Sequence, residues 1–168
     1  MIAFKAPATS QLRKLYAKWE VKVQAALMQE WTRKSKGVIA KLRGRTLKAD
    51  DGLTDSFWSA WEDDYVEILA PLLADGAMIG AEFGGAGLAV DWTLVNERAR
   101  DWAEEYAAQL VKRNSKMFET SLTDTDIANI RGAIAEWIES PEAFPDLAKR
   151  IDAVVKNKAR AEMIAATE

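Results

Sequence analysis

The side chains available for chemistry are carboxylates, lysines, tyrosines and hydroxyls, because the 168 residues include no His and no Cys. This composition excludes disulfides, thiol nucleophiles, imidazole bases and Cys/His zinc sites. The acidic run Glu62-Asp63-Asp64 could offer oxygen ligands to a divalent cation. However, consecutive acids on a helix point in different directions, and no calcium-loop spacing surrounds them. Acid–base work by paired carboxylates would need a cleft, which no motif indicates. We therefore expect no enzyme activity, no catalytic residue, no metal site and no cofactor.

The glycine-rich run Gly84-Gly85-Ala86-Gly87 is the other pattern that could suggest ligand chemistry, as a phosphate-binding loop. It fits neither the Walker pattern nor GxGxxG, and no strand is predicted before it. We interpret it as a break between two helices.

Charge is distributed unevenly along the chain, although the net charge is only −3. Residues 1–50 hold twelve Lys and Arg against three acids, whereas residues 51–90 hold eight acids and no Lys or Arg. This asymmetry indicates either pairing between the two segments and a solvated helix face, or a contact with nucleic acid or an acidic protein. The candidates for a DNA or polyanion contact are Arg33, Lys34, Lys36, Lys41, Arg43 and Arg45.

The seven Trp residues are an unusually high count for a chain of this length. Most fall on predicted apolar helix faces, which favours a role in the core. Trp58 and Trp61 share one helix face and lie beside acids. Because Trp is enriched at interface hot spots, these two are the preferred candidates for exposed anchors that contact a partner protein.

Apolar residues recur at three- and four-residue spacing almost throughout, and no segment alternates with a period of two. The sequence therefore predicts an all-α fold of about five helices. A long basic N-terminal helix starts at Ser10, and a second helix capped by Thr54 is kinked or restarted at Pro71. A compact three-helix unit follows, in which Thr123 and Asp126 resemble a capping box. We place one region at residues 1–83 and another at residues 84–168.

No membrane partner is expected. The N-terminus lacks the apolar core of a signal peptide, and acids and glycines interrupt the most apolar window, residues 65–92.

Two segments of the C-terminal half resemble a known family. Residues 91–103 (DWTLVNERARDWA) are similar to the "fd.vNprA..wA" segment of tailed-phage minor head proteins, the Mu F-like head morphogenesis family. Residues 160–168 (RAEMIAATE) resemble that family's "RAemIArTE" signature. The resemblance covers residues 83–168 well and the first 82 residues only loosely. Ala166 stands where the family usually has Arg, and family members typically continue beyond the position of Glu168.

The resemblance implies a non-enzymatic structural role in the phage head, after assembly in the bacterial host cytoplasm. Its partners would be the portal protein or the major capsid protein, with packaged DNA as a further contact, and self-association is left open. The candidate protein-interface residues are Trp58, Trp61, Asn96, Arg98, Trp102 and Arg160. The alternative is a sequence-independent DNA-binding module that uses the basic N-terminal helix.

Overall fold

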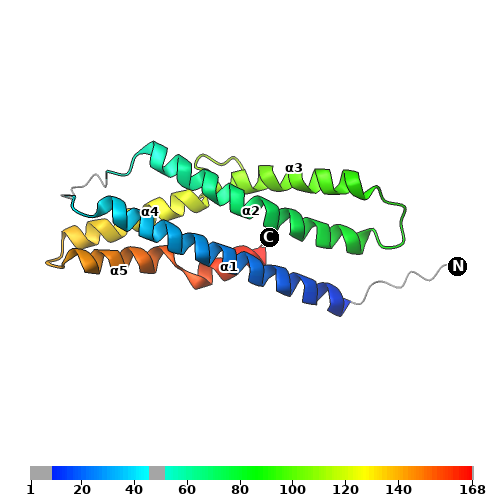
Figure 1. Ribbon diagram of the computed structural model, residues 1–168, viewed down its shortest axis with the longest axis horizontal. Helices are drawn as coiled ribbons and strands as arrows, with labels where there is room; N and C mark the ends of the chain where they lie inside the picture. The colour runs from blue at the N-terminus through cyan, green and yellow to red at the C-terminus, as the bar shows by residue number, and fades with distance from the viewer. Residues whose placement is uncertain (1–8, 46–51, 168) are drawn as a thin grey trace.

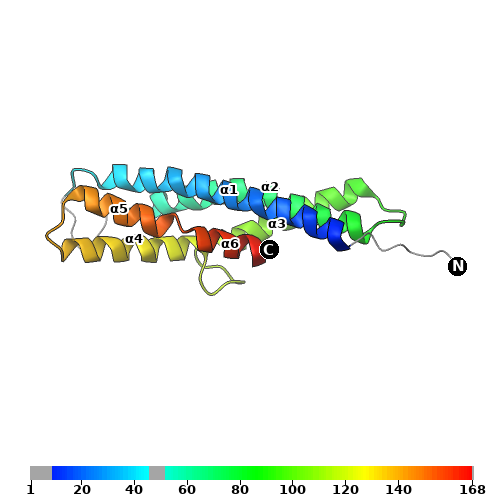
Figure 2. The ribbon, with the colours of Figure 1, turned by 90° about the horizontal axis from the view of Figure 1, so that it is seen from below.

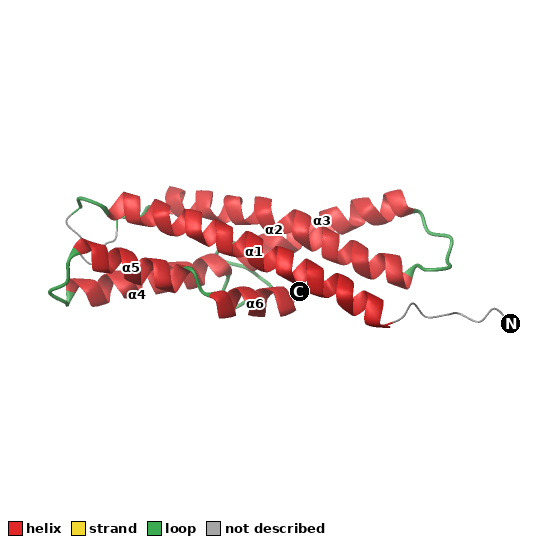
Figure 3. Ribbon diagram, turned by 60° about the horizontal axis from the view of Figure 1, so that its bottom comes forward, coloured by secondary structure: helices red, strands yellow, loops and turns green. Residues whose placement is uncertain are grey.

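The computed structural model describes residues 9–45 and 52–167, and all of its regular structure is helical (Figure 3). The predicted all-α class is confirmed. The single helix predicted at the C-terminus is bent at Lys156 and Asn157, where it divides into two segments. The helices are α1 Thr9–Leu42, α2 Asp55–Gly84, α3 Trp92–Val111, α4 Leu122–Ile138, α5 Phe144–Val155 and α6 Lys158–Thr167.

Side-chain caps fix where most of these helices start. The Thr54 hydroxyl accepts a hydrogen bond from the Phe57 amide, so this predicted cap is confirmed. Asp91 caps α3 in the same way. The capping box predicted at Thr123 and Asp126 is wrong by two residues, because Ser121 and Asp124 form it. Asp126 instead lies in the second turn of α4, and its side chain is buried in the core.

Helices α1 and α2 form an antiparallel hairpin. Lys34 of α1 donates to the Trp61 carbonyl at 2.8 Å, and Trp19, nearer the start of α1, donates to the Leu72 carbonyl at 2.6 Å. α2 continues through Pro71 without interruption, so the helix does not restart there. Likewise, α1 is unbroken at Gly37.

The remaining helices divide the molecule into two unlike ends. α3 runs back along α2, so helices on the two sides of the boundary expected at residues 83 and 84 pack together. α5 and α6 pack on α1, and α4 packs on α5. Figures 1 and 2 show α4 and α5 beside the C-terminal part of α1 and α6 beside its middle. The other end of this elongated molecule consists of α1, α2 and α3 only.

The core lies where all these helices meet. Trp31, Leu27 and Val38 of α1 are fully buried there, together with Ile130 of α4 and Ile151 of α5. α1 is further tied to α5 by the buried Ser35, whose hydroxyl donates to Asp152 at 2.8 Å. Across residues 9–45 and 52–167, no helix combines the length and apolar character that a membrane crossing needs.

Gly76 is needed for the close approach of α1 and α2. A Cβ atom at Gly76 would lie 2.8 Å from the Trp19 ring, whose indole nitrogen is held by the Leu72 carbonyl. We expect Gly76→Ala to lower the free energy of unfolding by about 1–3 kcal/mol, as overpacking does. The measurement is urea unfolding followed by circular dichroism.

Gly37→Ala is the matched control, because nothing lies within 4 Å of a Cβ placed at that helical glycine. Alanine should there raise stability by about 0.5–1 kcal/mol through its better helix propensity. Equal effects of the two substitutions would contradict the packing argument.

Candidate protein-interaction site

A buried carboxylate, Asp126, is the centre of the polar contacts between helices. Its side chain is fully buried, and its Oδ2 accepts hydrogen bonds from the Tyr65 hydroxyl at 2.7 Å and from the Trp61 indole at 3.1 Å. Tyr65 in turn accepts a hydrogen bond from the indole N–H of Trp31. Burial raises the pKa of Tyr65 well above its usual value, and the neighbouring Asp126 carboxylate adds to this effect. Tyr65 therefore stays protonated and can donate.

Arg160 of α6 supplies the opposite charge. Its guanidinium forms an ion pair with Asp126 Oδ1, donates to the Leu122 carbonyl at 3.0 Å and lies 5.3 Å from the centre of the Trp31 ring. Only 9% of the Arg160 side chain is exposed. This residue, a candidate for a partner contact, thus holds α6 against α1 and α4.

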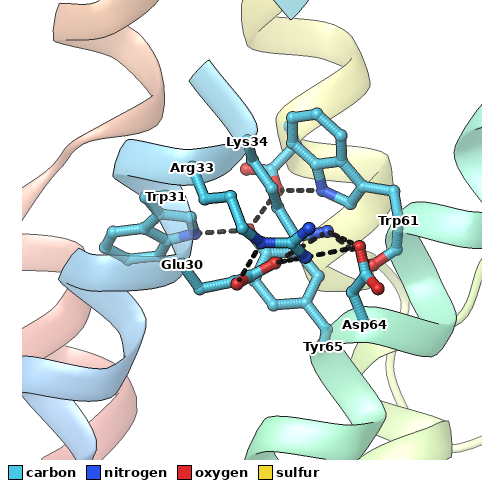
Figure 4. Close-up of polar contacts among 8 residues, drawn as sticks. Glu30, Trp31, Arg33, Lys34, Trp61, Asp64 and Tyr65 are labelled. Atoms are coloured by element: carbon cyan, nitrogen blue, oxygen red, sulfur yellow. Dashed lines mark hydrogen bonds and ion pairs between the residues drawn. The ribbon is translucent and has the colours of Figure 1, made fainter. Parts of the chain in front are cut away.

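A second buried charge, Lys34, lies one helical turn from Trp31 (Figure 4). Its ammonium is 4.4 Å from the centres of both the Trp61 and Tyr65 rings and 3.3 Å from Glu30. Burial lowers the pKa of Lys34, and the charges of Glu30 and Asp64 partly offset that effect. Because this ammonium is enclosed by rings and carboxylates, it is not accessible to DNA.

The expectation that Trp58 and Trp61 are exposed anchors is wrong. Their exposed fractions are 1% and 4%, and their rings pack on each other with centroids 5.3 Å apart. Acids beside them in the sequence do not bring them to the surface, because Glu62 turns toward α3 and accepts from Arg113. The indole N–H of Trp58 is buried and has no hydrogen-bond partner in the described part of the chain.

The other cations of the basic run lie on the outside of α1. Arg33 is exposed but pairs with Glu30 and with Asp64 of the acidic segment, so part of the predicted internal pairing is present. Arg45 donates to the Gly52 carbonyl at 3.2 Å. The other three are exposed and form no ion pair with any residue in 9–45 or 52–167: Lys36, Lys41 and Arg43.

A groove runs between α3, the start of α4 and α6, and holds about 390 Å³. Arg160 and Met163 of α6 line one side, and Tyr106 and Phe118 line the other. Trp102 extends this aromatic side, because its ring stacks on Tyr106 with centroids 5.1 Å apart, and Tyr106 meets Phe118 edge-to-face.

The groove brings together parts of two segments that are far apart in the sequence. Trp102 is 45% exposed and Met163 is 61% exposed, so both are accessible at its edges. Arg98 is exposed on the same helix as Trp102. Asn96 is half-buried and lines a different pocket, between α2 and α3, together with Arg100. Of the predicted interface residues, only Arg160 lines this groove, and Trp102 adjoins it through its stacking on Tyr106.

Sequence reasoning missed Asp126, Tyr65 and Glu30 as members of the buried cluster. A signal for Asp126 was present, since it lies four residues before Ile130 on the apolar face of α4. An acid on that face must find a buried partner. The partner itself, Arg160, is on another helix and follows from no local pattern.

Comparisons of this chain with protein families, with curated proteins and with solved structures find no match.

Removing the charge of Asp126 should leave the buried guanidinium of Arg160 without its counter-charge. We expect Asp126→Asn to lower the free energy of unfolding by about 3–5 kcal/mol, as loss of one partner of a buried ion pair does. Adding Arg160→Met should recover part of this loss, with a coupling energy of about 1–3 kcal/mol between the two sites. Chemical denaturation of the four proteins of the cycle gives this energy.

The control is Glu162→Gln, which breaks an exposed ion pair with Lys158 on the same helix as Arg160. Its effect should stay within about 0.5 kcal/mol. Additive effects at Asp126 and Arg160 would show that the two charges do not depend on each other.

Proposed function

We propose that this chain is a non-enzymatic assembly protein of a tailed phage, a minor head component that binds the portal or the major capsid protein. Its place of action would be the phage head, after assembly in the cytoplasm of the bacterial host. The proposal rests on the resemblance of residues 91–103 and 160–168 to the minor head family. The observation that carries it is that the second segment lines the groove through Arg160 and Met163, while Trp102 of the first segment stacks on Tyr106, which lines the same groove.

The chemistry of the groove suits a protein partner. Tyr and Trp lose little conformational entropy on binding, and Met adapts its shape to the surface it meets. The Trp102–Tyr106–Phe118 row is already ordered by ring contacts, so little further entropy would be lost when a partner docks. Arg160 also lines the groove, and its positive charge is neutralised by Asp126. An apolar side chain or short helix of the partner fits this surface better than a charged ligand does.

The direct test is a pull-down with the tagged chain from cells that carry the native phage or prophage genes. We expect portal or major capsid protein to be recovered and to resist nuclease treatment. Trp102→Ala and Met163→Ala should each reduce recovery about tenfold or more, since hot-spot truncations cost about 2 kcal/mol. Mass spectrometry of the bound fraction is the readout.

Ile138→Ala is the matched control, because Ile138 is 43% exposed but lies at the end of α4, outside the groove. It should leave recovery unchanged. Failure to recover either head protein would count against the adaptor function, and equal losses with all three variants would count against the groove.

The second candidate function is sequence-independent DNA binding along the outside of α1. The observation that favours it is that Lys36, Lys41 and Arg43 are exposed and make no ion pair within residues 9–45 and 52–167. Such cations are available to replace counterions along a phosphate backbone. Lys34 is not part of this surface.

Duplex binding should then weaken steeply between about 50 and 200 mM salt. The triple variant Lys36→Gln, Lys41→Gln and Arg43→Gln should make the salt slope shallower, by about one for each phosphate that is no longer neutralised. Fluorescence anisotropy with a labelled duplex measures both quantities. Substitution of Lys149 by Gln, on α5, is the control for removal of an exposed charge. Binding that is independent of salt would exclude this function.

A further inference from the structure

One end of the molecule is built from helical segments that bury no residue. We call it the distal end, made of residues 10–18 of α1 and residues 77–102, which join the last turns of α2 to the first half of α3. None of these residues is buried, whereas Trp19, Gly76 and Ala103 at its limits all are. Figures 1 and 2 show that no other helix reaches this end.

The distal end is nevertheless rich in large apolar side chains. Leu88, Trp92 and Leu94 at the tip of the α2–α3 hairpin are 59%, 41% and 44% exposed. On α1, Val21 is 64% exposed beside this end. Others are only partly covered: Leu12, Leu15, Tyr16, Met78, Ile79, Phe83, Val90 and Val95. Helices in water are stabilised mainly by packing of such a face, so the exposed faces indicate that something covers them.

Charge at the distal end is distributed unevenly between its two parts. Around its tip the α2–α3 hairpin carries four acids, Asp75, Glu82, Asp91 and Glu97, and further along α3 it carries Arg98, Arg100 and Asp101. The start of α1 carries one acid, Glu20, and four exposed cations around Val21: Arg13, Lys14, Lys18 and Lys22. None of these side chains forms an ion pair with another described residue, so the two parts do not neutralise each other within one chain.

We propose that the distal end is the interface of a homodimer, in which the acidic, apolar hairpin tip of one copy docks on the basic start of α1 in a second copy. Two copies related by a twofold axis would make this contact twice, since each carries both halves of it. The apolar residues of each hairpin tip would then lie beside Val21 and the cations of its partner. Residues 10–18 and 77–102 exceed the roughly 20–30 residues a side that a stable interface uses, so part of this surface suffices.

A second copy fits these observations better than a polyanion. Nucleic acid would satisfy the cations of α1, but it would be repelled by the four acids of the hairpin and would leave Leu88 and Trp92 uncovered. An anionic membrane surface would cover those two side chains, but it would be repelled by the same acids. The surface of the chain itself has the required complement of cations and exposed apolar side chains at the same end. This inference does not depend on the proposed role in the phage head.

The test is the mass of the full chain by sedimentation equilibrium from low to high micromolar concentration, where we expect a dimer. Leu88→Glu should raise its dissociation constant about tenfold or more, as loss of an apolar interface contact does. The pair Lys18→Glu and Lys22→Glu should weaken the dimer similarly, and so should the pair Glu82→Lys and Glu97→Lys. Combining all four substitutions should restore it, because the charges are again complementary.

The control is Lys41→Glu with Arg43→Glu, the same charge change at the opposite end of α1, which should leave the dimer unaffected. A monomer at all concentrations would overturn the proposal. A dimer that is insensitive to Leu88→Glu would do the same, because the interface would lie elsewhere. The proposal would also be overturned if the variant with all four charge substitutions stayed monomeric while circular dichroism showed its helices intact. A monomer whose binding to duplex DNA is abolished by Lys18→Glu and Lys22→Glu would assign these cations to a polyanion instead.

Discussion

The ion pair between Asp126 and Arg160 is the contact on which the arrangement of the helices depends. Burying either charge alone would cost several kcal/mol, so each is tolerated only where the other is within reach. Tyr65 and Trp61 donate hydrogen bonds to the other carboxylate oxygen of Asp126. Trp31 donates in turn to the Tyr65 hydroxyl. One carboxylate therefore links four helices: α1, α2, α4 and α6. An apolar core alone would tolerate small shifts of one helix along another, whereas this network has one register in which every donor is satisfied.

The same pair determines the shape of the surface. α6 is only ten residues long and is attached through the bend at Lys156 and Asn157, so its position depends on what Arg160 holds. Met163 and Ile164, one turn further along, form a wall of the groove opposite Tyr106 and Phe118. The buried charge thus acts on the groove without being available to a ligand. Arg160 therefore shapes the groove although only 9% of its side chain is exposed.

Much of the fold follows from local sequence patterns, but the cluster does not. Helix-period apolar spacing, the Thr54 cap and the glycines at residues 84–87 predict the all-α class, the long α1 and the break before α3. The burial of Trp58 and Trp61 could not be judged from the acids beside them, because Asp63 and Glu62 pair with Lys112 and Arg113, just after α3. Likewise, nothing local separates Lys34 from Lys36. On one helix, two residues apart, one faces the Trp61 and Tyr65 rings and the other faces solvent.

The charges that are separated along the sequence therefore take different roles in the structure. Part of it is internal, because Arg33 and Lys34 meet Asp64, while other acids of α2 are satisfied by α3. Within residues 9–45 and 52–167, the charges that form no ion pair include cations along the outside of α1 and acids at the hairpin tip. Figure 2 shows α1 and the loop before α4 on opposite sides of the molecule. Because that loop borders the groove, a partner in the groove and a partner on α1 would not compete for the same surface.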